Sequence, residues 1–139
     1  MKITIPGVPI AKARPRFVRV GKFVRTYDIQ ETEAGKWLLF AKNHITGMLT
    51  GPVRLKCEFI FPRPKGHYGT GRNSGKLKPS APAEHTKKPD VSNLIKFPED
   101  ILNGIAWHDD SQIIRIEAKK RYVEEGEVPM TKLVIGRGF

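Results

Sequence analysis

A long stretch without apolar side chains divides this sequence and limits the folds that the chain can adopt. Residues 62–89 contain four glycines and five prolines and almost no apolar side chain. A stretch of this kind is unusual inside a compact domain and is either functional or mobile. We expect a flexible basic loop here. The regular elements must therefore lie before and after it, and a chain of 139 residues suits a single domain, 1–139.

Alternating apolar and polar residues predict strands on both sides of this loop. The clearest case is residues 53–61, where one face of the predicted strand lies on the core and carries Cys57 as a small buried side chain. The same alternation predicts further strands at residues 3–5, 114–123 and 131–135 and a basic hairpin within residues 11–27 that turns near Gly21.

Apolar residues at spacings of three and four predict two main helices. The first begins at a capping box that starts with Asp28 and ends near Gly47. The second has Ser92 as its N-cap and ends near Gly104, with a kink or a restart at Pro98. The order of elements indicates an α+β fold with a mixed or antiparallel sheet of about four to six strands.

The charge of the chain is positive and is concentrated in two blocks. The sequence holds 25 Lys and Arg against 14 Asp and Glu, a net charge of +11. Residues 1–27 carry seven basic side chains and no acid, and residues 62–89 carry seven against one. The ordinary explanation is a polyanionic partner, most commonly nucleic acid. The DNA-binding candidates are Lys12, Arg14, Arg16, Arg19, Lys22, Arg25, Arg63, Lys65, Arg72, Lys76, Lys78, Lys87 and Lys88.

Other settings find little support in the sequence. No basic amphipathic helix or lipidation motif indicates a membrane partner, and no apolar run approaches the ~18 residues of a transmembrane helix. The first residues lack the apolar stretch of a signal peptide, so we expect a cytoplasmic protein. The single cysteine excludes an intramolecular disulfide and a cysteine-cluster zinc site.

Carboxylates gather around the second predicted helix. Asp90 precedes the helix, Asp109 and Asp110 follow it, and Lys96 and Asp100 share its polar face. A helix of about twelve residues separates its ends by roughly 18 Å, so the acids at the two ends meet only if the chain folds back. The next strand can do this by running antiparallel to the helix.

A divalent cation would explain carboxylates in a protein that binds phosphate. Magnesium takes hard oxygen ligands from carboxylates and phosphates, and it polarises a scissile phosphate and activates a water. A nearby lysine can hold the charge that develops on the phosphate. Asp90, Asp110 and Lys96 provide that set.

Each of these residues also has a purely structural explanation. Asp90 can cap the helix, Asp109 and Asp110 can form an Asx turn, and Lys96 and Asp100 can be a surface ion pair. Each structural explanation is the better one for a residue taken alone. Taken together in a chain of this charge, the residues favour a metal site.

Residues 86–113 resemble the RusA family of phage-type Holliday junction resolvases. The family pattern is Lys-Pro-Asp-x-Asp-Asn-Leu-x-Lys, then Asp-x-Leu-Asn-Gly, then Asp-Asp-x-Gln-Ile. Three pieces follow here in order, as Lys88-Pro89-Asp90, Asn93-Leu94, Lys96, Asp100, Leu102-Asn103-Gly104 and Asp109-Asp110-Ser111-Gln112-Ile113. A weaker similarity to a basic element of phage members lies in Lys12-x-Arg14-Pro15-Arg16.

The resemblance implies a function, its partners and its cofactor. It implies an intertwined homodimer that binds four-way junction DNA and introduces paired, symmetric nicks during recombination and repair, using Mg²⁺ or Mn²⁺ and no small-molecule cofactor. It also implies three metal-binding aspartates and a supporting lysine. Carried over, Asp90 and Asp110 are two of the aspartates and Lys96 is the lysine, and all three are catalytic candidates.

Ser92 stands where the resemblance implies the middle aspartate. Three consequences stay open: Asp100 or Asp109 binds the metal in its place, the metal binds more weakly, or the chain binds junctions without cutting them. The remaining matches favour an active nuclease. The first alternative is a non-catalytic DNA-binding protein with a decayed metal site, and the second is an RNA-binding protein, which the charge alone would permit.

Overall fold

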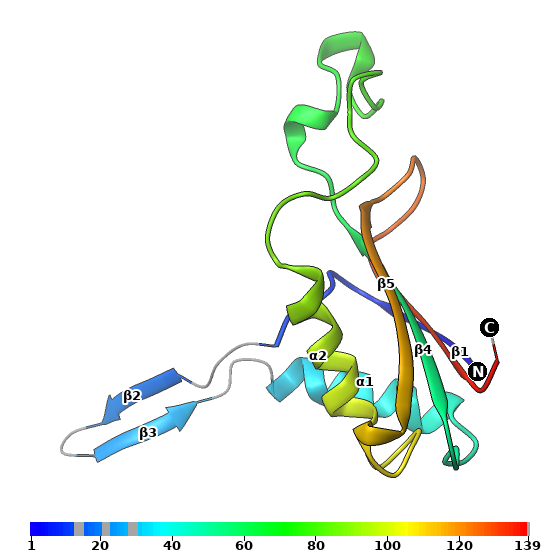
Figure 1. The fold of residues 1–139 in the computed structure, drawn as a ribbon. Helices are drawn as coiled ribbons and strands as arrows, with labels where there is room; N and C mark the ends of the chain where they lie inside the picture. The colour runs from blue at the N-terminus through cyan, green and yellow to red at the C-terminus, as the bar shows by residue number, and fades with distance from the viewer. Residues whose placement is uncertain (13–15, 21–22, 28–30, 139) are drawn as a thin grey trace.

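The computed structural model describes residues 1–12, 16–20, 23–27 and 31–138. Its centre is a four-stranded mixed sheet in the order β1-β6-β4-β5 (Figure 1). The central strand β4 pairs antiparallel with β6 and parallel with β5. The strands are β1 (Lys2–Pro6), β4 (Val53–Phe61), β5 (Ile113–Tyr122) and β6 (Met130–Gly136). All four contain the predicted alternations, which confirms an α+β fold built on a mixed sheet.

The predicted basic hairpin is also present. It consists of β2 (Arg16–Val20) and β3 (Phe23–Tyr27), which pair antiparallel and extend away from the sheet (Figure 1). The predicted turn at Gly21 and the predicted capping box at Asp28 lie outside the described residues.

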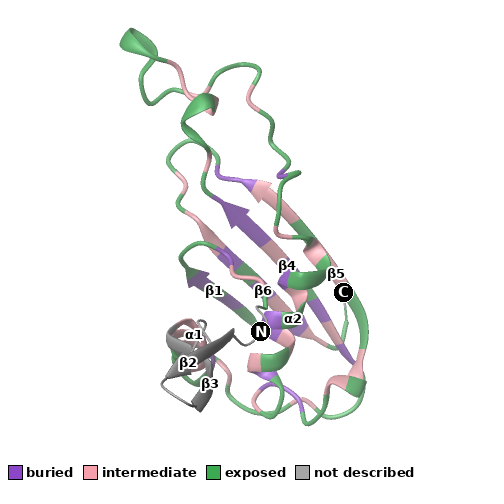
Figure 2. Cartoon of the chain, turned by 90° about the vertical axis from the view of Figure 1, so that its left-hand side faces the viewer, coloured by how far each residue is buried: buried purple, intermediate pink, exposed green. Residues whose placement is uncertain are grey.

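Two helices cover one face of the sheet, α1 (Glu31–His44) and α2 (Val91–Leu102) (Figure 2). Both bury apolar side chains against the alternating inward residues of the strands, and the ring of Trp37 in α1 meets Phe97 in α2 edge to face at 5.0 Å. Cys57 is buried on the same inner face, as predicted, and burial raises the pKa of its thiol to about 12.

The helix ends differ from the predicted ones. Helix α1 stops at His44, before Gly47. Helix α2 begins after Asp90, which occupies the N-cap position, so the prediction of Ser92 as N-cap is wrong. The Asp90 carbonyl already accepts the first helical bonds, from the amides of Asn93 and Leu94. Helix α2 continues through Pro98 without a restart.

The loop 62–89 extends from one end of the sheet (Figure 1). It contains two short 3-10 helices, η1 (Lys65–His67) and η2 (Gly71–Asn73). Arg63 anchors its base, because its Nε donates to the Val123 carbonyl at 2.8 Å and its Nη1 to the Pro82 carbonyl at 2.5 Å. His85 on the returning segment is buried and stacks on Phe61 at 4.1 Å. The flexibility of this loop stays a prediction.

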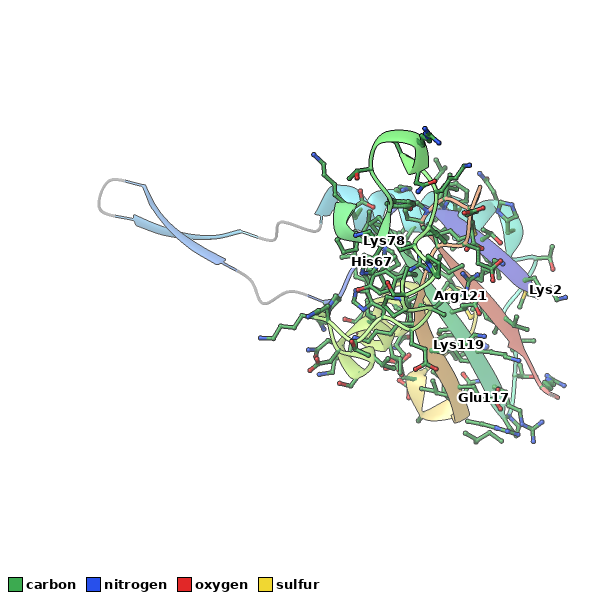
Figure 3. All side chains as sticks on the ribbon, turned by 90° about the horizontal axis from the view of Figure 1, so that it is seen from above. Lys2, His67, Lys78, Glu117, Lys119 and Arg121 are labelled. Atoms are coloured by element: carbon green, nitrogen blue, oxygen red, sulfur yellow. The ribbon has the colours of Figure 1, made fainter. Side chains whose placement is uncertain are left out.

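The other face of the sheet carries charged side chains. Glu117, Lys119 and Arg121 follow one another on this face of β5 (Figure 3). Glu58 in β4 pairs with both cations, with Lys119 at 2.8 Å and Arg121 at 3.4 Å. None of the helices described here has the length and the apolar character that crossing a lipid bilayer requires.

Candidate functional site

The turn between α2 and β5 is built on a buried tryptophan. Trp107 is fully buried, and its Nε1 donates to Oδ1 of Asp110 at 2.8 Å. Asp110 begins the short 3-10 helix η3 (Asp110–Gln112), directly before β5. The indole therefore fixes the orientation of the Asp110 carboxylate at the edge of the core.

Asp109 has a structural role in the same turn. Its Oδ2 accepts from the Ser111 amide at 2.9 Å. The Ser111 side chain first, and its backbone amide second, lower the pKa of the Asp109 carboxyl by hydrogen bonding to it. Gln112 completes a capping box, since its Oε1 accepts from the Asp109 amide at 3.0 Å. The Gln112 Nε2 donates to the carbonyls of Leu49 and Gly51, both at 3.0 Å. This turn is the structural explanation that the sequence also allowed for Asp109.

The polar face of α2 brings a further carboxylate to this end of the helix. Burial raises the pKa of Glu99, and the negative charges of Asp110 and Asp100 raise it further, while Lys96 opposes them. The sequence motifs did not single out Glu99. Its position three residues after Lys96, on the same helix face, is the signal that could have found it.

Two predicted site residues on α2 make contacts within the chain. Lys12 forms an ion pair with Asp100 at 2.5 Å, and its amide donates to the Asn93 carbonyl at 3.3 Å. The Lys96 Nζ donates to Oδ1 of Asn93 at 3.4 Å. The N-terminal basic segment therefore crosses α2 beside the acidic residues.

Asp90 lies at the opposite end of α2. It is exposed, and its side chain makes no capping hydrogen bond. The segment before it is attached to β5, because the Lys120 Nζ donates to the Pro89 carbonyl at 2.8 Å and to that of Lys87. Ser92 follows in the first turn of the helix and is exposed.

Asp90 and Asp110 do not meet within one chain. The chain folds back after α2 as expected, but Asp110 lies at the start of β5, beside the C-terminal end of the helix (Figure 1). The twelve residues of α2 separate the two ends by about 18 Å. In the part of the chain that the structure describes, no three His, Cys, Asp or Glu side chains lie together in a way that could hold a metal ion. One chain alone therefore does not fit the metal.

The basic candidates lie mainly on two extensions. Arg16, Arg19 and Arg25 belong to the hairpin strands, and Arg14 and Lys22 lie outside the described residues. In the loop, the guanidinium of Arg63 donates to the Pro82 carbonyl of the same loop and to the Val123 carbonyl after β5. The exposed cations of the loop are Lys65, Arg72, Lys76, Lys78, Lys87 and Lys88.

A helix that carries carboxylates, together with two basic extensions, is the combination expected of an enzyme that acts on nucleic acid. The chain matches the family model described as Endodeoxyribonuclease RusA over residues 6–131, and it belongs to that family of endodeoxyribonucleases. It is also similar to the uncharacterized protein YqaN of Bacillus subtilis (strain 168), with 34% identity over 135 residues that cover 92% of each chain.

Proposed function

We propose that this chain is a structure-selective endodeoxyribonuclease that resolves four-way DNA junctions by paired, symmetric nicks, in recombination and repair, with Mg²⁺ or Mn²⁺ as its cofactor. The family match carries this proposal, because it covers nearly the whole chain, including Asp90, Lys96 and Asp110. The basic residues of the hairpin strands and the exposed cations of the loop support it, since two basic extensions suit the phosphates of more than one DNA arm.

The proposal gives separate roles to the two kinds of residue. The cations of loop 62–89 and of the hairpin hold phosphates and set affinity without reading bases. Asp90 and Asp110 are the metal ligands, and Lys96 faces the cleaved phosphate. Trp107 is a positioning residue, because its hydrogen bond at 2.8 Å holds Asp110.

The test is cleavage of a synthetic four-way junction in Mg²⁺, read on a denaturing gel. We expect paired nicks from the wild type and a loss of at least about 100-fold in Asp90→Asn and in Asp110→Asn. Glu124→Gln is the matched control, because it removes one carboxylate charge from an exposed turn that follows β5 and is outside the candidate site. Equal cleavage by the wild type and both aspartate variants would refute the assignment.

The second candidate function is junction binding without cleavage. It is favoured by Ser92, which gives the site one carboxylate less than the family pattern, and by the failure of the described carboxylates of one chain to converge. Binding without nicks in Mg²⁺ or Mn²⁺ would support it. Ser92→Asp separates the two cases further, because a gain of nicking shows a weakened site and no gain shows that another carboxylate already serves.

A further inference from the structure

The face of the sheet opposite the helices, here called the open face, gathers cations from strands that lie far apart in the sequence. Residues that are paired across neighbouring strands point to the same face, so the registers fix which side chains lie here. The four strands hold two carboxylates, Glu58 and Glu117, and both lie on this face. Seven cations lie beside them: Lys2 in β1, Arg54 and Lys56 in β4, Arg115, Lys119 and Arg121 in β5, and Lys132 in β6.

The carboxylates do not neutralise the open face. Glu58 and Glu117 each pair with two of the cations, and Arg121 at the end of the face also binds Glu127 from the following turn, at 2.6 Å. Seven cations against three carboxylates leave a net charge of +4. Within the described part of the chain, Lys2 and Lys132 take part in no ion pair. Their charges are available to a partner.

The sequence does not reveal this surface, because its segments are balanced or acidic when their charges are summed. Residues 28–61 carry four basic side chains and four acids, and residues 90–139 carry seven and nine. Folding separates the two signs. Apart from Glu58 and Glu117, the described acids of these segments lie in helices, at helix caps or in the turn after β5. The alternation of the strands directs most of the cations to the open face.

The open face is hollowed at its centre and suits a broad, uniformly charged partner. A hollow of about 440 Å³ lies over Val134 and is bordered by Lys56, Lys119 and Lys132. Four strands about 4.8 Å apart span roughly 14 Å, which is comparable with the ~12 Å width of a DNA major groove. The residues that line the hollow include no aromatic ring and no side-chain amide. Such a surface can hold phosphates but has little means of reading bases.

We propose that the open face binds the phosphate backbone of linear duplex DNA, independently of base sequence. The choice of DNA over an acidic protein rests on the proposed function and on membership of a family of endodeoxyribonucleases. The position of the surface rests on the strand registers and the charges alone.

The duplex on the open face is not the one that is cut. The helix α2, which carries Lys96, lies on the opposite face of the sheet (Figure 2). Duplex DNA is stiff over about 150 base pairs, so a duplex on the open face cannot bend around the sheet to reach α2. The open face therefore keeps the protein on ordinary duplex DNA, along which it can slide until it meets a junction.

Substitution of the two unpaired lysines tests the surface. Lys2→Gln, Lys132→Gln and the double variant are titrated with a short linear duplex at several salt concentrations. Both lysines are exposed, so the melting temperature should stay at the wild-type value. A lysine that neutralises one phosphate contributes ~0.9 to the log–log salt slope, which corresponds to about eightfold in affinity at 0.1 M salt. We expect a loss of about eightfold in each single variant and of up to about 60-fold in the double variant.

Lys42→Gln is the matched control, because it removes the same charge from an exposed lysine of α1, on the other side of the sheet. Its affinity for the linear duplex should fall by less than about twofold, since salt screens charges beyond about 10 Å. Equal losses in the control and in the single variants, or an unchanged salt slope in the double variant, would overturn the proposal.

Protection of lysines from reductive methylation locates the duplex on the wild-type protein, without any substitution. We expect a linear duplex to protect Lys2, Lys56 and Lys132, and to leave Lys42 reactive. Protection of the same three lysines in the absence of DNA would show that a second copy of the chain covers the face. Protection by polyglutamate as strong as that by the duplex would show that an acidic protein fits equally well. Either result would overturn the proposal.

The two proposals fail differently. A wild type that nicks four-way junctions, but whose open-face lysines stay reactive with linear duplex, would overturn the surface and leave the proposed function. A wild type whose open face is protected by linear duplex, but which cuts no junction in Mg²⁺ or Mn²⁺, would contradict the proposed function and leave the surface.

Discussion

The hydrogen bond between Trp107 and Asp110 gives the sharpest test of how this fold positions a functional residue. Trp107→Phe keeps an aromatic ring in a fully buried position but removes the N–H that donates to Oδ1 at 2.8 Å. The substitution creates a small cavity and removes a hydrogen bond to a carboxylate. We expect the free energy of unfolding to fall by about 2–4 kcal/mol, a large part of the 5–15 kcal/mol of an ordinary domain.

A double-mutant cycle with Asp110→Ala separates the two contributions. The cavity is common to Trp107→Phe and the double variant, so the coupling energy isolates the hydrogen bond. A hydrogen bond to a charged group contributes about 1.5–3 kcal/mol when buried. Because Asp110 is only half-buried and water can replace part of the bond, we expect a coupling near 1 kcal/mol.

Urea unfolding of the four proteins measures the coupling. Trp37, the other of the two tryptophans, remains in every variant as a fluorescent probe. A coupling energy within about 0.3 kcal/mol of zero would show that the bond does not hold Asp110, and the positioning role of Trp107 would be refuted. Trp107→Phe should also lower the rate at which the protein nicks junctions, while its affinity for the junction stays the same.

Three further predictions concern the rest of the chain. The hydrogen bond from Arg121 lowers the pKa of Glu127 to about 2. This pair therefore stabilises the fold at pH values above the ordinary carboxyl pKa, and the stabilisation is lost as the pH falls towards about 2. Melting temperatures measured across this pH range should fall less steeply in Glu127→Gln than in the wild type. Arg63→Lys keeps the charge but loses the fork that binds two carbonyls, and limited proteolysis within 62–89 should accelerate by about tenfold. Lys76→Ala with Lys78→Ala should lower the log–log salt slope of junction binding by up to about 0.9 for each phosphate that is no longer neutralised, read by titration at several salt concentrations, and should leave melting unchanged.

The sequence predicted those elements whose burial leaves a periodic pattern. Strand β4 alternates because only one face meets the helices, and α2 carries an apolar stripe for the same reason. The turns inside loop 62–89 escaped prediction, because they are held by isolated backbone bridges such as Tyr68 to Leu77, which require no apolar period. The exact start of α2 also escaped, because backbone geometry placed Asp90, and not Ser92, at the cap.

The candidate site shows a different limit. Sequence motifs singled out Asp90, Lys96 and Asp110 as candidates. Their spacing alone could not tell whether Asp110 would lie beside the N-terminal or the C-terminal end of α2. The short helix η3 follows the turn at once, so Asp110 stays at the near end of α2. Glu99 escaped because it belongs to none of the motif pieces, and its partial burial beside Asp110 and Asp100 depends on the tertiary structure.

The parallel pairing of β4 with β5 has a consequence for how this protein can diversify. Loop 62–89 and α2 both lie inside the single crossover that joins these strands. The entropy of closing such a crossover rises only with the logarithm of its length, so doubling a long loop costs about 0.6 kcal/mol. We expect insertions and deletions at the tip of the loop to leave the sheet intact. Relatives can therefore exchange this arm for one of another length or charge, and acquire a preference for differently branched substrates, on an unchanged framework.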